Sequence, residues 1–153
     1  MDRTVTALPS DLYLADDELE LRVPGDMEAG RTGAPVYVLG IFRRGTGIEV
    51  GRMIVRLDPD DPGLAGYAGH VAFEVAPEHR GRRGALRATR LVAPLARRHG
   101  FAALWITTTP DNAACRRTLE LLGAEYVDTV VVPEDSDMRA LGMDRVCRYR
   151  WVL

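Results

Sequence analysis

Arginine and glycine residues gather between a predicted strand and a predicted helix near the middle of the chain. The strand ends at Val75, and the segment His79–Ala85 that follows contains three arginines and two glycines. The first turn of a helix exposes unpaired N–H groups and carries about half a positive charge, which suits a pyrophosphate. Glycine lets the backbone approach phosphate oxygens, and arginine adds charge-assisted hydrogen bonds. This segment therefore predicts a phosphate-binding loop, although a short glycine-rich turn is a weak signal by itself.

Glu74 and His70 are the candidate acid–base groups beside this loop. In the alternating strand Gly69–Val75, both side chains are expected on the face opposite Phe73. Glu74 stands at the strand end next to the loop, so we predict that it is the general base; the alternative is an ion pair with a neighbouring arginine. His70 lies about 13 Å away along the strand and is a second catalytic candidate, with a structural role as its alternative.

The elements that must position these groups follow from the hydrophobic periodicity. Strands are expected at Leu19–Val23, Val36–Phe42, Glu49–Leu57, Gly69–Val75, Ala103–Ile106, Tyr126–Val132 and Arg145–Leu153. Loops are expected at Asp58–Gly66 and Pro133–Asp144, and Pro24–Pro35 has no helical periodicity. The order of strands and helices predicts an α/β (mixed α+β) fold in which helices flank a mixed sheet.

Two helices are expected next to the loop. Arg82–His99 has an apolar stripe at helical spacing, and Pro94 inside it predicts a kink or a lost backbone hydrogen bond. Gly100 is its expected C-terminal cap. The second helix is expected to begin at Asp111, its predicted N-cap, and to end at Gly123.

Length and composition favour one domain over residues 1–153, because 46% of the residues are apolar and 27% are charged. Met1–Asp17 is polar and irregular, so we expect a loosely ordered N-terminal arm. Cys115 and Cys147 lack metal-ligand spacing, and no metal is expected. The absence of a cleavable leader and of an apolar run near 18 residues predicts a cytoplasmic protein.

The charge pattern argues against nucleic acid and membrane partners. The formal net charge of −2 gives no field that would attract the whole molecule to either. The arginines between Arg80 and Arg98 could form a basic surface, but no aromatic side chains interleave them as stacking platforms. We therefore expect neither partner.

The segment from Gly69 to Ala124 resembles a bacterial subgroup of the GNAT superfamily, the acyl-CoA-dependent N-acetyltransferases. The family motif is Arg or Gln, two residues, Gly, one residue and then Gly or Ala, and Arg80 and Ala85 occupy its outer positions. A second element, Trp105–Asn112, also matches. The resemblance implies a GNAT-type twisted mixed sheet of six or seven strands, whose fourth and fifth strands splay apart, and acetyl-CoA as co-substrate. The cofactor-binding residues that it implies are Phe73, Val75, Arg80, Gly81, Arg82, Arg83, Gly84, Ala85 and Asn112.

Three departures from the family pattern bear on function. Arg83 stands where the first Gly of the motif is expected, and it is penalised if that site needs a positive φ. Leu119 replaces a tyrosine that protonates the departing thiolate in many relatives. Pro24–Pro35 is too short for the two helices that usually cover the acceptor site. We therefore expect an acceptor cleft that is open or completed by a partner chain.

These features predict an N-acetyltransferase that moves an acetyl group from acetyl-CoA to a primary amine of a small molecule or peptide by direct attack on the thioester. The acidic residues Glu134, Asp135 and Asp137 favour a cationic acceptor, with a plain surface loop as the alternative. A homodimer is a further expectation from the family. Two alternatives stay open: a GNAT-like protein that binds CoA or another ligand without turnover, and a dimeric interaction module.

Overall fold

The computed structural model describes residues 3–153. Its strands are β1 (Thr4–Thr6), β2 (Leu14–Ala15), β3 (Leu19–Arg22), β4 (Glu28–Arg31), β5 (Val36–Arg43), β6 (Glu49–Arg56), β7 (Val71–Val75), β8 (Ala103–Thr108), β9 (Glu125–Val131) and β10 (Arg145–Val152). Its helices are α1 (Gly84–Leu91), α2 (Ala93–Arg98), α3 (Ala113–Leu122) and α4 (Asp137–Ala140), with a π-helical turn at Leu64–Ala68 and a 3₁₀ turn at Pro77–His79.

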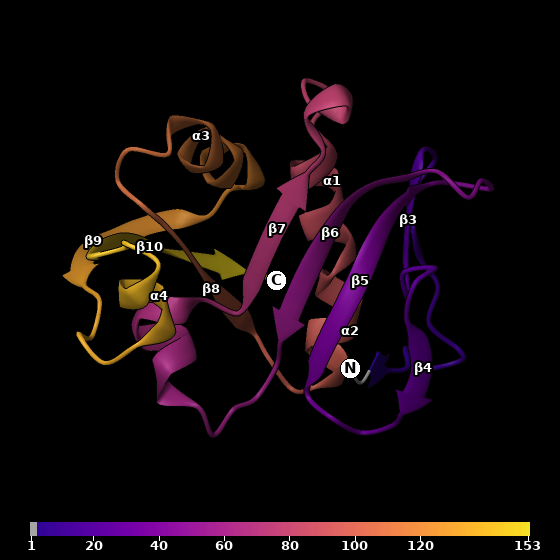
Figure 1. Ribbon diagram of the computed structural model, residues 1–153, viewed down its shortest axis with the longest axis horizontal. Coiled ribbons are helices and arrows are strands. Elements are labelled where there is room, and N and C mark those ends of the chain that lie inside the picture. Colours follow the sequence, from indigo (N-terminus) through magenta and orange to yellow (C-terminus); the bar gives the residue numbers. More distant parts are fainter. Residues whose placement is uncertain (1–2) are drawn as a thin grey trace.

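The strands form three hydrogen-bonded sheets. A five-stranded antiparallel sheet has the order β2-β3-β5-β6-β7, a three-stranded antiparallel sheet has the order β8-β10-β9, and β1 pairs in parallel with β4. The two larger sheets meet where the His70 N–H donates to the Trp105 carbonyl oxygen at 2.6 Å. From this point β7 and β8 diverge (Figure 1). The fold is therefore the splayed, helix-flanked α+β arrangement that the resemblance implies, although the expected single mixed sheet of six or seven strands is divided into antiparallel sheets of five and three strands.

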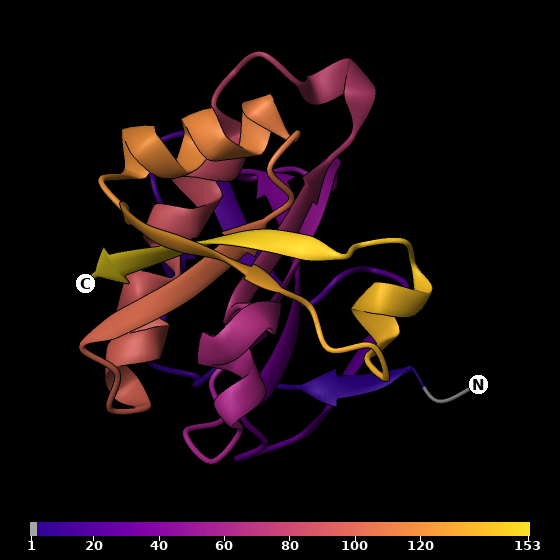
Figure 2. The ribbon, with the colours of Figure 1, turned by 90° about the vertical axis from the view of Figure 1, so that its left-hand side faces the viewer.

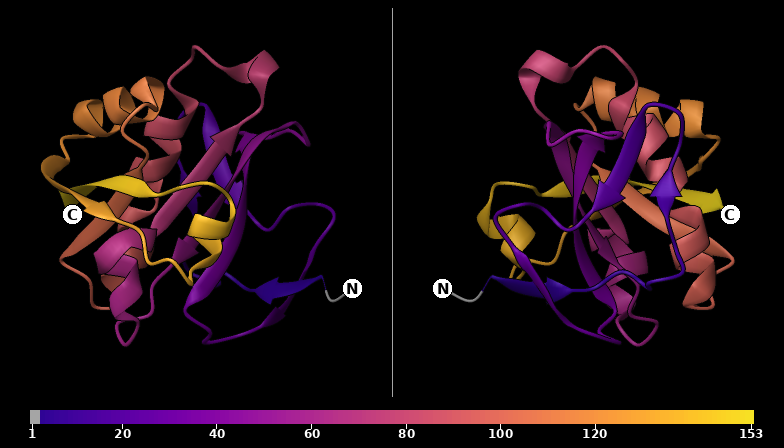
Figure 3. Two further views of the ribbon diagram at one scale, coloured as in Figure 1. Left: turned by 60° about the vertical axis from the view of Figure 1, so that its left-hand side comes forward. Right: turned by 90° about the vertical axis from the view of Figure 1, so that its right-hand side faces the viewer.

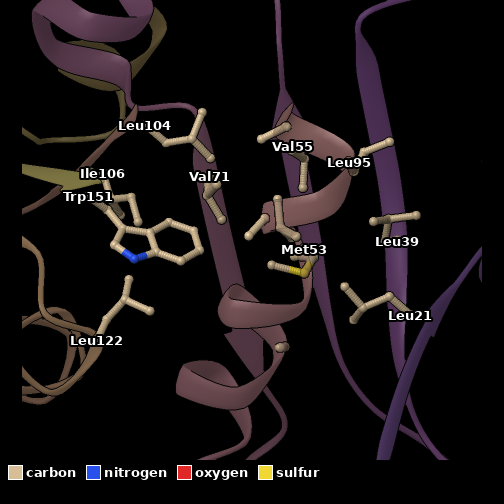
Figure 4. Close-up of a cluster of buried hydrophobic side chains, with 14 of the residues drawn as sticks. Leu21, Leu39, Met53, Val55, Val71, Leu95, Leu104, Ile106, Leu122 and Trp151 are labelled. Carbon is tan, nitrogen blue, oxygen red and sulfur yellow. The ribbon is translucent and has the colours of Figure 1, made fainter. Parts of the chain in front are cut away.

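Helices cover the sheets and close the space beside the diverging strands. The helices α1 and α2 lie behind β5, β6 and β7, and α3 lies beside α1 (Figures 1 and 2). Alternate strand residues point toward these helices because side chains alternate across a strand. The core cluster in Figure 4 includes Leu21, Leu39, Met53, Val55, Val71, Leu95, Leu104, Ile106, Leu122 and Trp151. Each such side chain contributes about 1.5–3 kcal/mol when it is fully buried.

The predicted helix Arg82–His99 is interrupted at Val92, two residues before its proline. The chain forms α1 and α2, with Val92 between them still in the right-handed region. Pro94 lies in the first turn of α2, where a backbone N–H has no acceptor within the helix. The missing N–H of proline therefore costs α2 no hydrogen bond. Gly100 follows α2 at φ 88°, which confirms the predicted C-terminal cap.

The N-cap of α3 is Asn112 and not Asp111, so the sequence-based prediction was wrong by one residue. The Asn112 Oδ1 atom accepts from the Cys115 N–H at 3.1 Å, while Gly123 ends the helix at φ 89° as predicted. Two expected loops also contain short helical turns. The π-helical turn begins inside Asp58–Gly66, and α4, capped by Ser136, lies inside the expected loop at 133–144.

The expected loosely ordered arm is not observed over residues 3–17; residues 1–2 lie outside the described part of the chain. In the structure, β1 pairs with β4 and β2 pairs with β3, along the side of the molecule opposite β9 and β10 (Figure 3). Three carboxylates, those of Asp16, Asp17 and Glu18, surround the Arg87 guanidinium on α1. Asp11 also binds Arg98 through two hydrogen bonds of 3.0 and 3.1 Å. These partners lie 69 to 87 residues apart in sequence, so local polarity could not reveal them.

Asp16 makes the stability of this arrangement depend on pH. Burial pushes the pKa of the Asp16 carboxyl upward, but hydrogen bonds from the N–H groups of Leu19 and Glu18 and from Arg87 outweigh it and hold the pKa below its ordinary value. A carboxyl with a depressed pKa in the folded state stabilises the fold above its unfolded pKa, and this stabilisation disappears as the pH falls. We expect the free energy of unfolding, measured in urea, to decrease from about pH 5 downward.

The variant Asp16→Asn should weaken that dependence, because it removes the titrating carboxyl. Its stability should fall most at neutral pH and approach that of the unaltered protein at about pH 2–3. Asp60→Asn is the matched control, since Asp60 is an exposed loop acid with no recorded side-chain partner among residues 3–153. Equal pH slopes for the unaltered protein and Asp16→Asn would refute this account.

Candidate active site

A cleft of about 620 Å³ opens between β7, the loop before α1 and the start of α3. Its lining consists of Phe73, Glu74, Val75, Arg80, Gly81, Arg83, Gly84, Ala85, Leu86, Asn112, Ala114, Cys115 and Thr118. The structure thus brings together every residue predicted to bind the cofactor except Arg82, which lines a second cavity on the other side of α1. The strand, loop and helix elements meet because β7 and β8 diverge at this place.

The strand β7 is an edge strand whose free side faces the cleft. Within residues 3–153 it pairs with β6 alone, and the Arg56 N–H donates to the His70 carbonyl oxygen at 2.7 Å at one end of the ladder. At the other end the Ala76 N–H donates to the Val50 carbonyl oxygen at 2.9 Å. Because main-chain hydrogen bonds alternate in direction along an antiparallel strand, the even-numbered residues of β7 turn their N–H and C=O groups toward β6.

Phe73 and Val75 consequently turn their main-chain groups away from β6, toward the cleft that both residues line. The Val75 carbonyl oxygen accepts from Arg80 Nε at 2.9 Å, which fixes the Arg80 side chain at the end of the strand. The N–H groups of Phe73 and Val75 are donors that a bound carbonyl can use. Glu74 offers the cleft only its side chain.

Arg83 holds the most unusual backbone conformation in the loop. At φ 57° and ψ 30° it is the one residue other than glycine with a positive φ in the described range 3–153. The family motif has Gly at this position, so the site does require a left-handed conformation and Arg83 adopts it at a cost. That conformation costs an L-amino acid roughly 1–2 kcal/mol. Because these dihedral angles are left-handed, Arg83 cannot belong to the right-handed helix, and the helix predicted from Arg82 begins at Gly84.

Replacing Arg83 with glycine should therefore stabilise the protein. We expect Arg83→Gly to raise the free energy of unfolding by about 1 kcal/mol, because glycine tolerates this conformation although its unfolded chain is freer. For a chain of this length the melting temperature should rise by about 2–4 °C in a calorimetric scan. Arg82→Gly is the control, since Arg82 has no positive φ, and it should not stabilise the protein. A melting temperature of Arg83→Gly below that of the unaltered protein would show that the arginine side chain contributes more than the strain costs.

The Glu74 carboxylate is exposed and has no recorded hydrogen bond or ion pair with any of residues 3–153. Its neighbour across the β6–β7 ladder is Arg52. Arg52 binds other acids instead: its Nε lies 2.6 Å from Glu49 Oε1, and its Nη2 lies 2.8 Å from Asp26 Oδ1. The alternative in which an arginine neutralises Glu74 is therefore not observed.

His70 lies far from this carboxylate, just before the opposite end of β7. Only 5% of the residue is exposed, and its ring packs edge-on against Phe101. The Nδ1 atom accepts from the Trp105 N–H at 2.8 Å, and burial lowers the pKa of the imidazole. The ring therefore stays neutral and joins the two sheets, which is the structural role given as the alternative to catalysis, and it does not share the exposed face of Glu74.

Sequence reasoning missed the cleft residues of α3. Ala114, Cys115 and Thr118 share one helix face, since residues three and four apart are neighbours on a helix. That spacing was available in the sequence, but nothing marked this face as facing a cavity. Burial raises the pKa of the Cys115 thiol, so it remains protonated at neutral pH. Leu119, at the position of the absent tyrosine, is completely buried in the core and does not line the cleft.

The donors around the cleft fit a CoA-type cofactor. The N–H groups of Gly84, Ala85 and Leu86 lie in the first turn of α1, where a helix has no internal acceptors for them. Arg80 and Arg83 add positive charge at the same place, and the edge of β7 adds donors for a carbonyl. The Asn112 Oδ1 atom caps α3 by accepting from the Cys115 N–H. No helix among the described residues is long and apolar enough to cross a membrane.

Comparisons with solved structures place this fold among acetyltransferases. A Vibrio cholerae protein, provisionally titled a ribosomal-protein-serine acetyltransferase, is similar over 95% of this chain and 100% of its own, with a TM-score of 0.66 and 11% identity. A GCN5-related N-acetyltransferase from Kribbella flavida matches over 81% and 71%, with a TM-score of 0.58 and 19% identity. The microcin C7 self-immunity acetyltransferase, solved with acetyl-CoA and AMP, matches over 78% of this chain and 62% of its own, with a TM-score of 0.58 and 14% identity.

The sequence itself carries the family signature. A search of curated proteins finds no significant match. The model of the acetyltransferase (GNAT) domain, however, matches residues 3–125, which include the edge strand β7, the loop with Arg83 and the whole of α3. The matched region thus contains every element that builds the cleft, and the chain belongs to the GNAT acetyltransferase family.

Proposed function

We propose that this protein transfers an acetyl group from acetyl-CoA to a primary amine of a small molecule or peptide, by direct attack of the amine on the thioester. The observation that carries the proposal is the meeting of two donor sets in one cleft. The free edge of β7 supplies N–H groups for a carbonyl, and the start of α1 with its arginines supplies donors for a pyrophosphate.

The start of α1 would hold the cofactor by its pyrophosphate. The N–H groups of Gly84, Ala85 and Leu86 point out of the first helical turn, and a helix N-terminus favours negative charge there. Arg80 and Arg83 line the cleft and add charge-assisted hydrogen bonds. The role of Asn112 is to fix the junction between β8 and α3, because its side-chain oxygen is already used as the cap.

The edge of β7 would hold the thioester. An N–H group of Phe73 or Val75 can donate to the thioester oxygen, and this bond strengthens as the oxygen gains negative charge in the tetrahedral intermediate. Removing one such donor typically costs a factor of about 10²–10³ in rate. Holding the amine against the carbonyl supplies more, since well-oriented groups reach effective molarities of about 10⁵ M or higher.

Glu74 would accept the proton that the amine must lose. The ammonium first loses one proton to the Glu74 carboxylate, directly or through water. The nitrogen–carbon bond then forms, the carbon–sulfur bond breaks, and the second proton that the nitrogen must lose passes to water or to the departing thiolate. The leaving group is a thiolate, and an alkyl thiol with a pKa of about 8.5 can leave near neutral pH without a dedicated acid. This account tolerates the absence of a tyrosine at Leu119. His70 takes no part, because its buried ring is already bonded to Trp105.

The acceptor side of the sheet is open. No helix stands between β3 and β5 in the described chain, and this stretch contains β4 instead. Arg52 neutralises Asp26 and Glu49 on this face, but Glu74 has no such partner, so we infer that the acceptor presents a cation such as a primary ammonium group to Glu74. Because two of the similar structures are titled ribosomal-protein acetyltransferases, short peptides with a free N-terminus belong in the first screen.

Release of CoA thiol in the presence of acetyl-CoA and a panel of amines and peptides tests the proposal. With an accepted amine, Glu74→Gln should lower the turnover number at neutral pH by about 10²-fold or more, while acetyl-CoA binding is retained. The loss should shrink for weakly basic amines that are already deprotonated. Glu78→Gln is the matched control, an exposed acid four residues away that does not line the cleft.

Acetyl-CoA binding without thiol release for any member of the panel would contradict the catalytic proposal. It would favour the alternative in which a GNAT-like protein binds the cofactor as a ligand. Equal loss of activity in Glu74→Gln and Glu78→Gln would show that general negative charge near the cleft matters, and that Glu74 is no specific base.

A further inference from the structure

A second cavity of about 670 Å³ lies on the other side of the start of α1. It is lined by Glu18, Leu19, Arg43, Val50, His79, Arg82, Gly84 and Arg87. Gly84 lines both cavities, so the first turn of α1 separates them. The residues come from the start of β3, the end of β5, β6, the loop before α1 and α1 itself, so several elements of the fold build the cavity.

One of its three arginines is already neutralised. Arg87 is held by Asp16 at 2.9 Å, by Glu18 at 2.7 Å and by Asp17. These bonds also use Glu18, which is the only carboxylate in the described lining. The cavity therefore has no free negative charge to offer to its remaining cations.

Arg43 and Arg82 supply that remaining positive charge. Neither guanidinium has a recorded carboxylate partner among residues 3–153. Arg43 Nη2 lies 3.4 Å from His79 Nδ1, and this contact is a weak one at that distance. Two guanidinium groups and an imidazole thus surround one space whose floor is formed by apolar side chains such as Leu19 and Val50.

We propose that this second cavity binds a phosphate monoester through Arg43, Arg82 and His79. A doubly charged phosphate offers oxygens that match the forked guanidinium donors. The phosphate has two possible sources. The first is the ribose 3′-phosphate of a CoA molecule whose pyrophosphate lies on the other side of Gly84, and this source rests on the proposed function. The second is a separate phosphorylated ligand.

Calorimetric titrations distinguish these sources. CoA and dephospho-CoA, which lacks the 3′-phosphate, are titrated into the unaltered protein and into Arg43→Gln and Arg82→Gln. Adenosine 3′,5′-bisphosphate and inorganic phosphate serve as probes that do not need the thioester cleft. Arg97→Gln is the control, because it removes the same charge from an exposed position on α2 that lines neither cavity.

If the source is the cofactor, the unaltered protein should bind CoA about 10-fold or more tightly than dephospho-CoA, as expected for a lost charge-assisted contact. Arg43→Gln and Arg82→Gln should remove this preference, and Arg97→Gln should keep it. If the source is separate, the same two variants should lose binding of the bisphosphate or phosphate probe while their affinity for CoA is unchanged.

The proposal is overturned if both variants bind CoA, dephospho-CoA and the two phosphate probes as the unaltered protein does. The outcome is separable from that of the proposed function. A protein that binds no CoA but loses phosphate binding in Arg43→Gln refutes the acetyl-CoA proposal and supports this one. Melting temperatures of the variants show whether each is folded.

Discussion

Ala85→Glu should strongly weaken acetyl-CoA binding without destabilising the protein. Ala85 lines the cleft in the first turn of α1, so a glutamate there places a negative charge where the pyrophosphate would lie. Repulsion of about 3 kcal/mol, typical of like charges several ångströms apart near a protein surface, weakens binding about 100-fold. The same carboxylate interacts favourably with the helix dipole, by about 0.3–1 kcal/mol.

Ala113→Glu is the matched control for this variant. It introduces the same side chain into the first turn of α3, at an exposed position that does not line the cleft. Its melting temperature should be unchanged or slightly higher, and its affinity for acetyl-CoA should match that of the unaltered protein within about threefold. Calorimetric titration measures the affinities. Unimpaired binding in Ala85→Glu would exclude the first turn of α1 as the pyrophosphate site.

Gly51→Ala should be strongly destabilising, although alanine is only one methyl group larger. A Cβ atom at Gly51 would lie 2.4 Å from the Glu74 carbonyl oxygen and 3.0 Å from the Val75 Cα. Both neighbours are backbone atoms, so no side chain can rotate away and β7 must shift. We expect a loss of about 3 kcal/mol in the free energy of unfolding, which lowers the melting temperature by about 6–12 °C.

The shift should also weaken acetyl-CoA binding, because Glu74 and Val75 are part of the cleft lining. Gly47→Ala in the β5–β6 turn is the control: nothing lies within 4 Å of its added Cβ, and its φ is not positive. That variant should retain the stability and affinity of the unaltered protein. A melting temperature of Gly51→Ala within about 2 °C of that of Gly47→Ala, a difference well below the expected loss, would contradict this prediction. It would mean that β6 and β7 separate easily at this point.

The phosphate loop and its helix could be predicted because their signals are local. Arg80, Gly81 and Ala85 are close in sequence, and the strand before them and the helix after them each have a clear period. The structure places these residues in the lining of one cleft, because residues so close in sequence in one loop and helix start remain close in space. The sequence showed that Arg83 would be penalised if its site needs a positive φ, but whether the site needs one could be read only from the backbone dihedral angles.

What the sequence did not reveal depends on distant partners. Nothing near Asp16 indicates that Arg87 would bind it, because 71 residues separate the two. His70 was expected on the same face as Glu74, but β7 and β8 meet at this end, which buries its ring beside Phe101 and within hydrogen-bond distance of Trp105. Arg82 was expected in the cofactor cleft beside Arg80, yet the first turn of α1 directs it to the second cavity. Such placements follow from tertiary packing and have no local signature.

The most direct test of the central claim is a calorimetric titration of the unaltered protein with acetyl-CoA, with ATP as a control for simple attraction between phosphate and arginine. The account predicts saturable binding at one site, in the micromolar range, that ATP does not reproduce and that Ala85→Glu weakens about 100-fold. No saturable heat with acetyl-CoA, or equal binding of ATP, would contradict it. Either result would show that the loop around Arg83 does not select acetyl-CoA.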